Sequence, residues 1–127
     1  MELKKVFLSG SGGRPQVQIT FGFAQHGRYR IYLWSPAGDS PRLIGQGVNT
    51  DDVPDRFALE DPITGLNNHI VSWEGLVTSF AGGSGEQYLL QVDVSQDGAN
   101  CPDGPFIQTG SLDNVKAFYD AVTLVVR

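Results

Sequence analysis

Three stretches of the chain alternate apolar and polar side chains with a period of two. Apolar side chains occupy every second position over residues 17–23, 29–33 and 88–94. Successive side chains of a β-strand point to opposite faces of the sheet, so this period is typical of strands with one buried face. Sixteen glycines and seven prolines in 127 residues supply the turns that many short strands need. The pattern therefore predicts sheets rather than helices.

We expect one domain over residues 1–127. A chain of this length is the usual size of one domain and buries enough surface for a core without metals or disulfides. The predicted fold is all-β, an antiparallel β-sandwich of the jelly-roll or immunoglobulin-like type with about seven or eight strands. At most one short helix is expected, near residues 111–117, where Ser111 or Asp113 would serve as its N-cap.

The first two alternating stretches are predicted to form a β-hairpin. Side chains that face each other across two strands point to the same side of the sheet. A three-residue loop that ends at Gly27 satisfies this rule, because it pairs Phe21 with Ile31 and places Gly27 at the left-handed position. A two-residue turn would instead pair Phe23 with Arg30 and mix the two faces.

Residues 69–80 form a long β-rich run whose alternation slips at Glu74 and Gly75. A glycine inside a strand pattern indicates a β-bulge, which we therefore expect at this point. Trp73 is in step with two valines of the same run, and we assign it to the core.

The charge of the chain excludes several partners. The net charge is −5. Arg28 and Arg30 are the nearest approach to a basic cluster, and two charges do not make the basic surface of a nucleic-acid-binding protein. Binding to an anionic membrane is disfavoured for the same reason, and no apolar run approaches the roughly 18 residues of a membrane span. The single cysteine and an N-terminus without an apolar signal segment favour the cytoplasm.

Catalysis is not expected. A nucleophile needs a base beside it, and the two histidines lie in a predicted tight loop (His26) and at a strand start (His69). Cys101 stands in a loop with Asp97 and Asp103, which should raise the pKa of its thiol. A small hydrolase is therefore only the third choice of function.

Five aspartates are candidate metal ligands. Asp51, Asp52 and Asp55 occupy one predicted loop, and Asp97 and Asp103 occupy another. One cysteine and two histidines offer too few nitrogen and sulfur ligands for zinc or iron, so a bound ion would be calcium held by oxygen atoms. Aspartate also hydrogen-bonds the backbone of turns, and this is the favoured interpretation of the five.

The predicted hairpin has an outer face with two aromatic rings, two arginines, an amide and a hydroxyl. These candidate binding residues are Gln18, Thr20, Arg28, Arg30, Tyr32 and Trp34. Trp, Tyr and Arg are enriched at protein interfaces, so the expected function is a non-catalytic module that binds another protein, or copies of itself, through this face and the adjoining loops. The alternative is a lectin-like carbohydrate-binding module that stacks a sugar on Tyr32 and Trp34 and uses loop-bound calcium.

Overall fold

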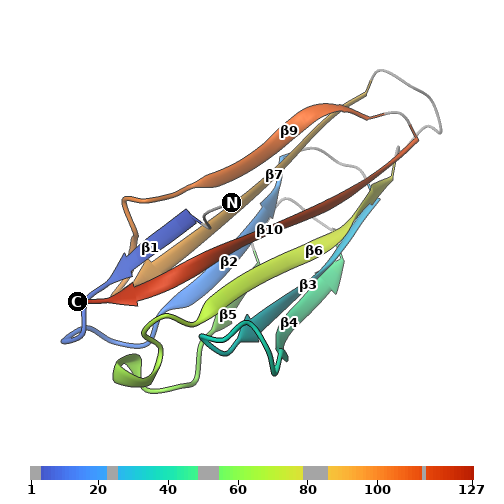
Figure 1. The fold of residues 1–127 in the computed structure, drawn as a ribbon. Coiled ribbons are helices and arrows are strands. Elements are labelled where there is room, and N and C mark those ends of the chain that lie inside the picture. Colours follow the sequence, from blue (N-terminus) through green and yellow to red (C-terminus); the bar gives the residue numbers. More distant parts are fainter. Residues whose placement is uncertain (1–3, 23–25, 49–54, 79–85, 113) are drawn as a thin grey trace.

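The computed structural model describes residues 4–22, 26–48, 55–78, 86–112 and 114–127, and arranges them as two β-sheets (Figure 1). The first sheet contains, in spatial order, β1 (Lys4–Leu8), β10 (Val115–Val126), β6 (Ile70–Thr78), β3 (His26–Trp34) and β4 (Arg42–Val48). The second sheet contains β5 (Asp55–Ala58), β2 (Gln16–Phe21) and β7 (Glu86–Gln96), and both β8 (Ala99–Asn100) and β9 (Phe106–Leu112) pair with β7. A single 3₁₀ turn, η1 (Ile63–Gly65), lies between β5 and β6 among the described residues.

The all-β prediction is confirmed, and the structure corrects two of its details. The described residues form ten strands rather than seven or eight, and β1 runs parallel to β10, so the first sheet is not wholly antiparallel. The predicted helix near residues 111–117 is also wrong, because β9 ends and β10 begins there. Asn114, with a φ of 73°, makes the turn between them, while the candidate cap Asp113 lies outside the described residues.

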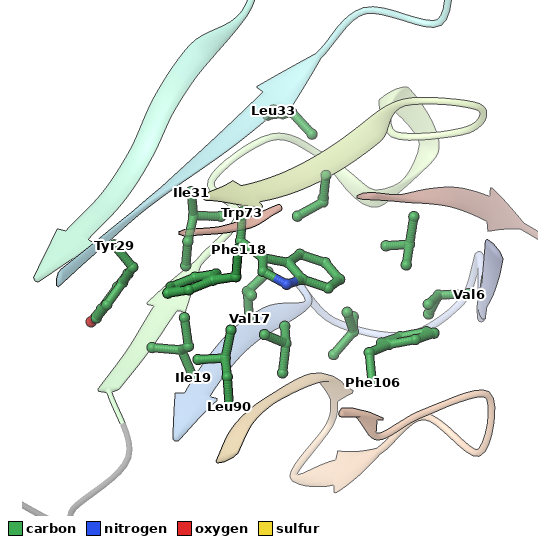
Figure 2. Close-up of a cluster of buried hydrophobic side chains, with 14 of the residues drawn as sticks. Val6, Val17, Ile19, Tyr29, Ile31, Leu33, Trp73, Leu90, Phe106 and Phe118 are labelled. Carbon is green, nitrogen blue, oxygen red and sulfur yellow. The ribbon is translucent and has the colours of Figure 1, made fainter. Parts of the chain in front are cut away.

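The period-two pattern correctly predicts which side chains are buried. Val17, Ile19 and Phe21 of β2 are buried, as are the alternate apolar residues of β3 and β7. Side chains from both sheets meet in one apolar layer, with Trp73 near its middle and Tyr29 and Phe106 on either side (Figure 2). Burial of these rings and branched side chains is the main favourable contribution to folding.

The predicted hairpin is wrong, because β2 and β3 belong to opposite sheets. β2 pairs with β5 and β7, whereas β3 pairs with β4 and β6. The two strands predicted to be hydrogen-bonded neighbours instead face each other across the core, where the rings of Phe21 and Tyr29 lie 6.0 Å apart. Alternation shows which face of a strand is buried, but it does not show which strand lies beside it. Phe23 of the predicted hairpin and Gln25 of its loop lie outside the described residues.

Gly27 is needed for space rather than for a left-handed backbone. Among the described glycines, only Gly38 and Gly98 have a positive φ, and Gly27 is part of β3. A Cβ atom at Gly27 would lie 2.6 Å from a ring carbon of Phe21.

We expect Gly27→Val to destabilise the protein by about 1 kcal/mol or more, because the branched side chain would have to displace the buried ring of Phe21. Urea melts of the wild type and the variant measure the difference. Gly27→Ala, with a smaller side chain, should lose less stability. Equal midpoints for all three proteins would contradict the close packing of Gly27 on Phe21.

Gly75 is likewise a point of close approach and not a bulge. Its strand keeps a continuous register with both β3 and β10. A Cβ atom there would overlap the carbonyl oxygen of Arg28 and lie 2.6 Å from the ring of Phe118. The register shift of this sheet occurs elsewhere, between β3 and β4, where Ile44 is the extra residue between Gly45 and Leu43.

Candidate functional site

The structure separates the six candidate binding residues into two groups. Arg28, Arg30, Tyr32 and Trp34 alternate with the buried residues of β3 and point outward from the first sheet. Gln18 and Thr20 point outward from the second sheet, on the opposite side of the protein. Gln18 accepts a hydrogen bond from Nε of Arg56 on the neighbouring strand β5 (3.0 Å). The predicted composite face therefore does not form, and only its four β3 residues lie together.

The β3 arginines line an open hollow of about 700 Å³ on the outer face of the first sheet. Its walls come from three neighbouring strands. Outward side chains in the lining are Arg28 and Arg30 of β3, Gln46 and Val48 of β4, and Glu74 and Leu76 of β6. The hollow thus combines charged, amide and apolar groups over β6, β3 and the edge strand β4.

Strand register arranges the hollow in two rows. Arg30 lies between Gln46 and Glu74, and directly opposite residues of neighbouring strands have Cβ atoms about 5 Å apart. Glu74 therefore offsets part of the charge of Arg30. The second row places Arg28 between the apolar side chains of Val48 and Leu76. Arg28 is consequently the cation of the hollow with an apolar side chain on each side.

The outer face of the first sheet is basic on an acidic protein. Among the described residues of this face, Lys5, Arg28 and Arg30 carry positive charge and only Glu74 carries negative charge. The whole chain has a net charge of −5. The charged side chains of this face are therefore mostly opposite in sign to the net charge of the chain.

The hollow is flanked by apolar side chains that were not predicted as binding residues from the sequence. Tyr119 of β10 stands opposite Glu74 and is 60% exposed, and Val48 is 56% exposed. Of the five large apolar side chains exposed in the described part of the chain, four lie on strands of the first sheet: Leu43, Val48, Val115 and Tyr119. One feature of the sequence could have indicated them: the segment that forms the 12-residue strand β10 has apolar residues at positions of both faces, and not only of the buried face.

Trp34 is partly used by the fold itself. Its ring is half-buried, and its Nε1 donates a hydrogen bond to Oγ of Ser72 (2.8 Å), whose side chain is buried beneath it. The rings of Tyr32 and Trp34 are 6.5 Å apart and tilted by 57°. They do not form the single flat platform that would stack on a sugar ring.

The aspartates predicted as metal ligands accept hydrogen bonds from the protein. Oδ2 of Asp103 accepts from the backbone N–H of Phe7 (3.1 Å), and a carboxylate oxygen of Asp55 accepts from the hydroxyl of Tyr29. Asp51 and Asp52 lie outside the described residues. Within the described ranges, no three His, Cys, Asp or Glu side chains gather closely enough to hold a metal ion.

Gln96 and Asp97 fasten the glycine-rich segment that follows β1. The Gln96 amide donates to the carbonyl oxygens of Ser9 and Gly13 and accepts from the N–H of Ser9, each at 2.9 Å. Asp97 accepts from the N–H of Gly13 at 3.0 Å. A Cβ atom at Gly12 or Gly13 would lie 2.7 or 2.8 Å from the Asp97 carboxylate, which explains the two glycines. The carboxylate of Asp97 thus accepts a hydrogen bond from loop backbone, in line with the favoured interpretation of the five aspartates.

The surroundings of Cys101 favour the neutral thiol over the nucleophilic thiolate. Burial raises the pKa of its thiol above the usual value, and the negative charge of Asp103 raises it further. From the sequence, both Asp97 and Asp103 are expected to raise this pKa. Of the two, only Asp103 contributes, and burial contributes more. The pKa of the Tyr29 hydroxyl is also raised, by burial and by its hydrogen bond to the Asp55 carboxylate, so that this phenol stays protonated.

Comparison of the chain with protein-family models, with curated proteins and with solved structures gave no match. No helix within the described ranges has the length and apolar character needed to cross a membrane.

Proposed function

We propose that the chain is a non-catalytic module that binds another protein through the outer face of its first sheet. The observation that carries this proposal is the hollow over β3, β4 and β6, where two arginines stand among exposed apolar side chains. Exposed apolar groups gathered on one face commonly mark interaction sites, and arginine and tyrosine are the residue types that contribute most to them. The finer assignment of the fold, to a β-sandwich of the jelly-roll or immunoglobulin-like type, stays a prediction.

The partner that fits this face is an acidic polypeptide segment with apolar side chains. Arg28 stands between Val48 and Leu76, so a carboxylate bound to it would have an apolar side chain on each side. The hydrogen bonds between a guanidinium and a carboxylate are stronger than those between neutral groups. Arg28 and Arg30 are two residues apart on one strand, a separation of about 7 Å. An extended partner with acidic residues at every second position has the same spacing. Tyr119 and Val48 provide apolar contact on the two sides.

A carbohydrate partner remains the alternative, with less support from the geometry. Gln18 and Thr20, the amide and the hydroxyl of the predicted face, lie on the other sheet, and the rings of Tyr32 and Trp34 are tilted relative to each other. Calcium-assisted sugar binding has the further difficulty that Asp97 and Asp103 already accept backbone hydrogen bonds. A hydrolase with Cys101 as its nucleophile is disfavoured by the raised pKa of this thiol.

A random 12-residue peptide library displayed on phage tests the proposal. Peptides selected on the wild-type protein should be enriched in Asp and Glu flanked by apolar residues. Synthetic copies of them should bind Arg28→Glu at least about thirtyfold more weakly, the effect of losing about 2 kcal/mol of interaction energy. The matched control is Arg56→Glu, which makes the same charge change on the outer face of the second sheet and should leave binding unchanged.

Two results would overturn the proposal. One is a set of selected peptides that bind Arg28→Glu and the wild type equally well. The other is saturable binding on a glycan array that Trp34→Ala abolishes and Arg28→Glu does not, which would establish the carbohydrate alternative.

A further inference from the structure

Among the described strands, every strand at a sheet edge except one has a feature that opposes pairing with another chain. β1 carries Lys4 and Lys5, β4 carries Arg42 and the extra residue Ile44, and β5 has only four residues, including Arg56. β8 has only two residues. Charged side chains, bulges and short length are the usual means by which proteins keep edge strands from pairing with other chains.

β9 has none of these protections. It is seven residues long, contains no charged residue and no proline, and pairs with β7 in a continuous register. In the described part of the chain it pairs with no strand along its other side, at the margin of the second sheet (Figure 1). Ile107, a large apolar residue on its outward face, is 51% exposed. An unguarded edge of this kind presents a row of free backbone N–H and C=O groups.

We propose that β9 pairs with β9 of a second copy of this chain, antiparallel about a two-fold axis through Thr109. In this register all seven residues are paired. Thr109 faces Thr109, Ile107 faces Ser111, and the buried Phe106 faces the buried Leu112 of the second copy. The two second sheets then become one continuous sheet across the dimer.

Three observations favour a second copy as the occupant. The strand has no charge, so two copies meet without repulsion along its length. Lys4 contacts the strand through the ring of Phe106, with its Nζ 5.6 Å from the ring centroid. In this register the two Phe106 residues lie at opposite ends of the paired strands, about 20 Å apart, so the two Lys4 side chains do not meet. Gln108, whose buried Oε1 has no hydrogen-bond partner, faces Gly110 of the second copy. Because glycine has no side chain, this pairing leaves room for the Gln108 side chain. At the axis, Thr109 of each copy lies opposite Thr109 of the other, a pair of β-branched side chains that suits neighbouring strands. The hydroxyl of Thr109 donates a hydrogen bond to the carbonyl oxygen of Tyr88 on β7 (2.7 Å).

This dimer is independent of the proposed binding function. β9 belongs to the second sheet, so the hollow over Arg28 on the first sheet stays free in both copies. Pairing would make the module bivalent, with two identical faces for its partner.

Sedimentation equilibrium from micromolar to millimolar concentration tests the dimer. The molar mass of the wild type should rise with concentration from 13.8 kDa toward twice that value. Thr109→Lys places two like charges opposite each other at the axis and should raise the dissociation constant at least about tenfold. Thr20→Lys is the matched control, because it makes the same change on the outer face of the central strand β2 and should leave dimerisation unchanged. Circular dichroism confirms that both variants are folded.

Disulfide trapping tests the register itself. In a Cys101→Ser background, Thr109→Cys should form a crosslinked dimer on mild oxidation, because the two Cβ atoms are neighbours across the axis. Ile107→Cys should not, since the two copies of residue 107 are about 13 Å apart in this register. A monomer at every concentration would overturn the proposal. So would a dimer that Thr109→Lys leaves intact, or equal crosslinking at positions 107 and 109.

Discussion

Gly75→Ala is expected to destabilise the protein by on the order of 3 kcal/mol or more. The added methyl group would overlap the carbonyl oxygen of Arg28 and lie 2.9 Å from Cα of Tyr29, both of which belong to the backbone of the adjacent strand. Side chains relieve such clashes by changing rotamer, but here two hydrogen-bonded strands in the middle of a sheet would have to separate. The ring of Phe118 would lie 2.6 Å from the same methyl group, so the strand cannot avoid the clash by shifting toward that ring.

Chemical denaturation of Gly75→Ala beside Gly65→Ala measures this effect. Gly65 lies in the 3₁₀ turn η1, its φ is not positive, and a Cβ atom there meets nothing within 4 Å. Gly65→Ala should therefore be neutral or stabilise by a few tenths of a kcal/mol, because alanine lowers the entropy of the unfolded chain. A Gly75→Ala protein as stable as Gly65→Ala would show that β3, β6 and β10 do not approach each other as described.

Trp73→Ala is expected to lose about 3–5 kcal/mol of folding free energy, and Trp34→Ala clearly less. Trp73 is only 1% exposed and packs against Phe106, with ring centroids 6.0 Å apart, so its removal leaves a large cavity in the core. Trp34 lies on the outer face, and its removal deprives the buried hydroxyl of Ser72 of one hydrogen bond, a loss of about 1–3 kcal/mol. Trp34→Ala should remain folded at room temperature.

Parallel urea melts of the two tryptophan variants decide the assignment. Trp73→Phe is a useful third protein, because it keeps most of the ring and removes an indole N–H that has no hydrogen-bond partner in the described structure. It should lose much less stability than Trp73→Ala. Equal damage from Trp34→Ala and Trp73→Ala would mean that both rings belong to the core, and the outer face of the first sheet would lose its support as a binding surface.

The candidate site was predictable only in part. Alternation placed Arg28, Arg30, Tyr32 and Trp34 on the outward face of one strand, because that prediction depends on the local strand geometry alone. Glu74, which faces Arg30, was noticed only as the place where a pattern slipped. Glu74 lies 44 positions after Arg30 in the chain, and no local pattern predicts that their two strands are neighbours.

Glycine shows the same limit. Glycine is a typical residue for a left-handed turn or a bulge, so Gly27 and Gly75 were assigned to those roles. Both are instead required by what lies against them, the ring of Phe21 in one case and the backbone of Arg28 in the other. Space requirements of this kind depend on atoms brought in from distant parts of the chain, whereas a turn is encoded by its own few residues.

The sequence by itself determined the all-β class, the buried face of each alternating strand and the core position of Trp73, because a period of two and side-chain hydrophobicity act within a single strand. Only the tertiary structure decided that β2 and β3 lie in opposite sheets, and hence that Gln18 and Thr20 are on the other side of the protein from Arg28 and Trp34. Strands that contribute to one core satisfy the same burial pattern whether they are hydrogen-bonded neighbours or face each other across the core. The choice between these arrangements is made by the packing of all the strands together.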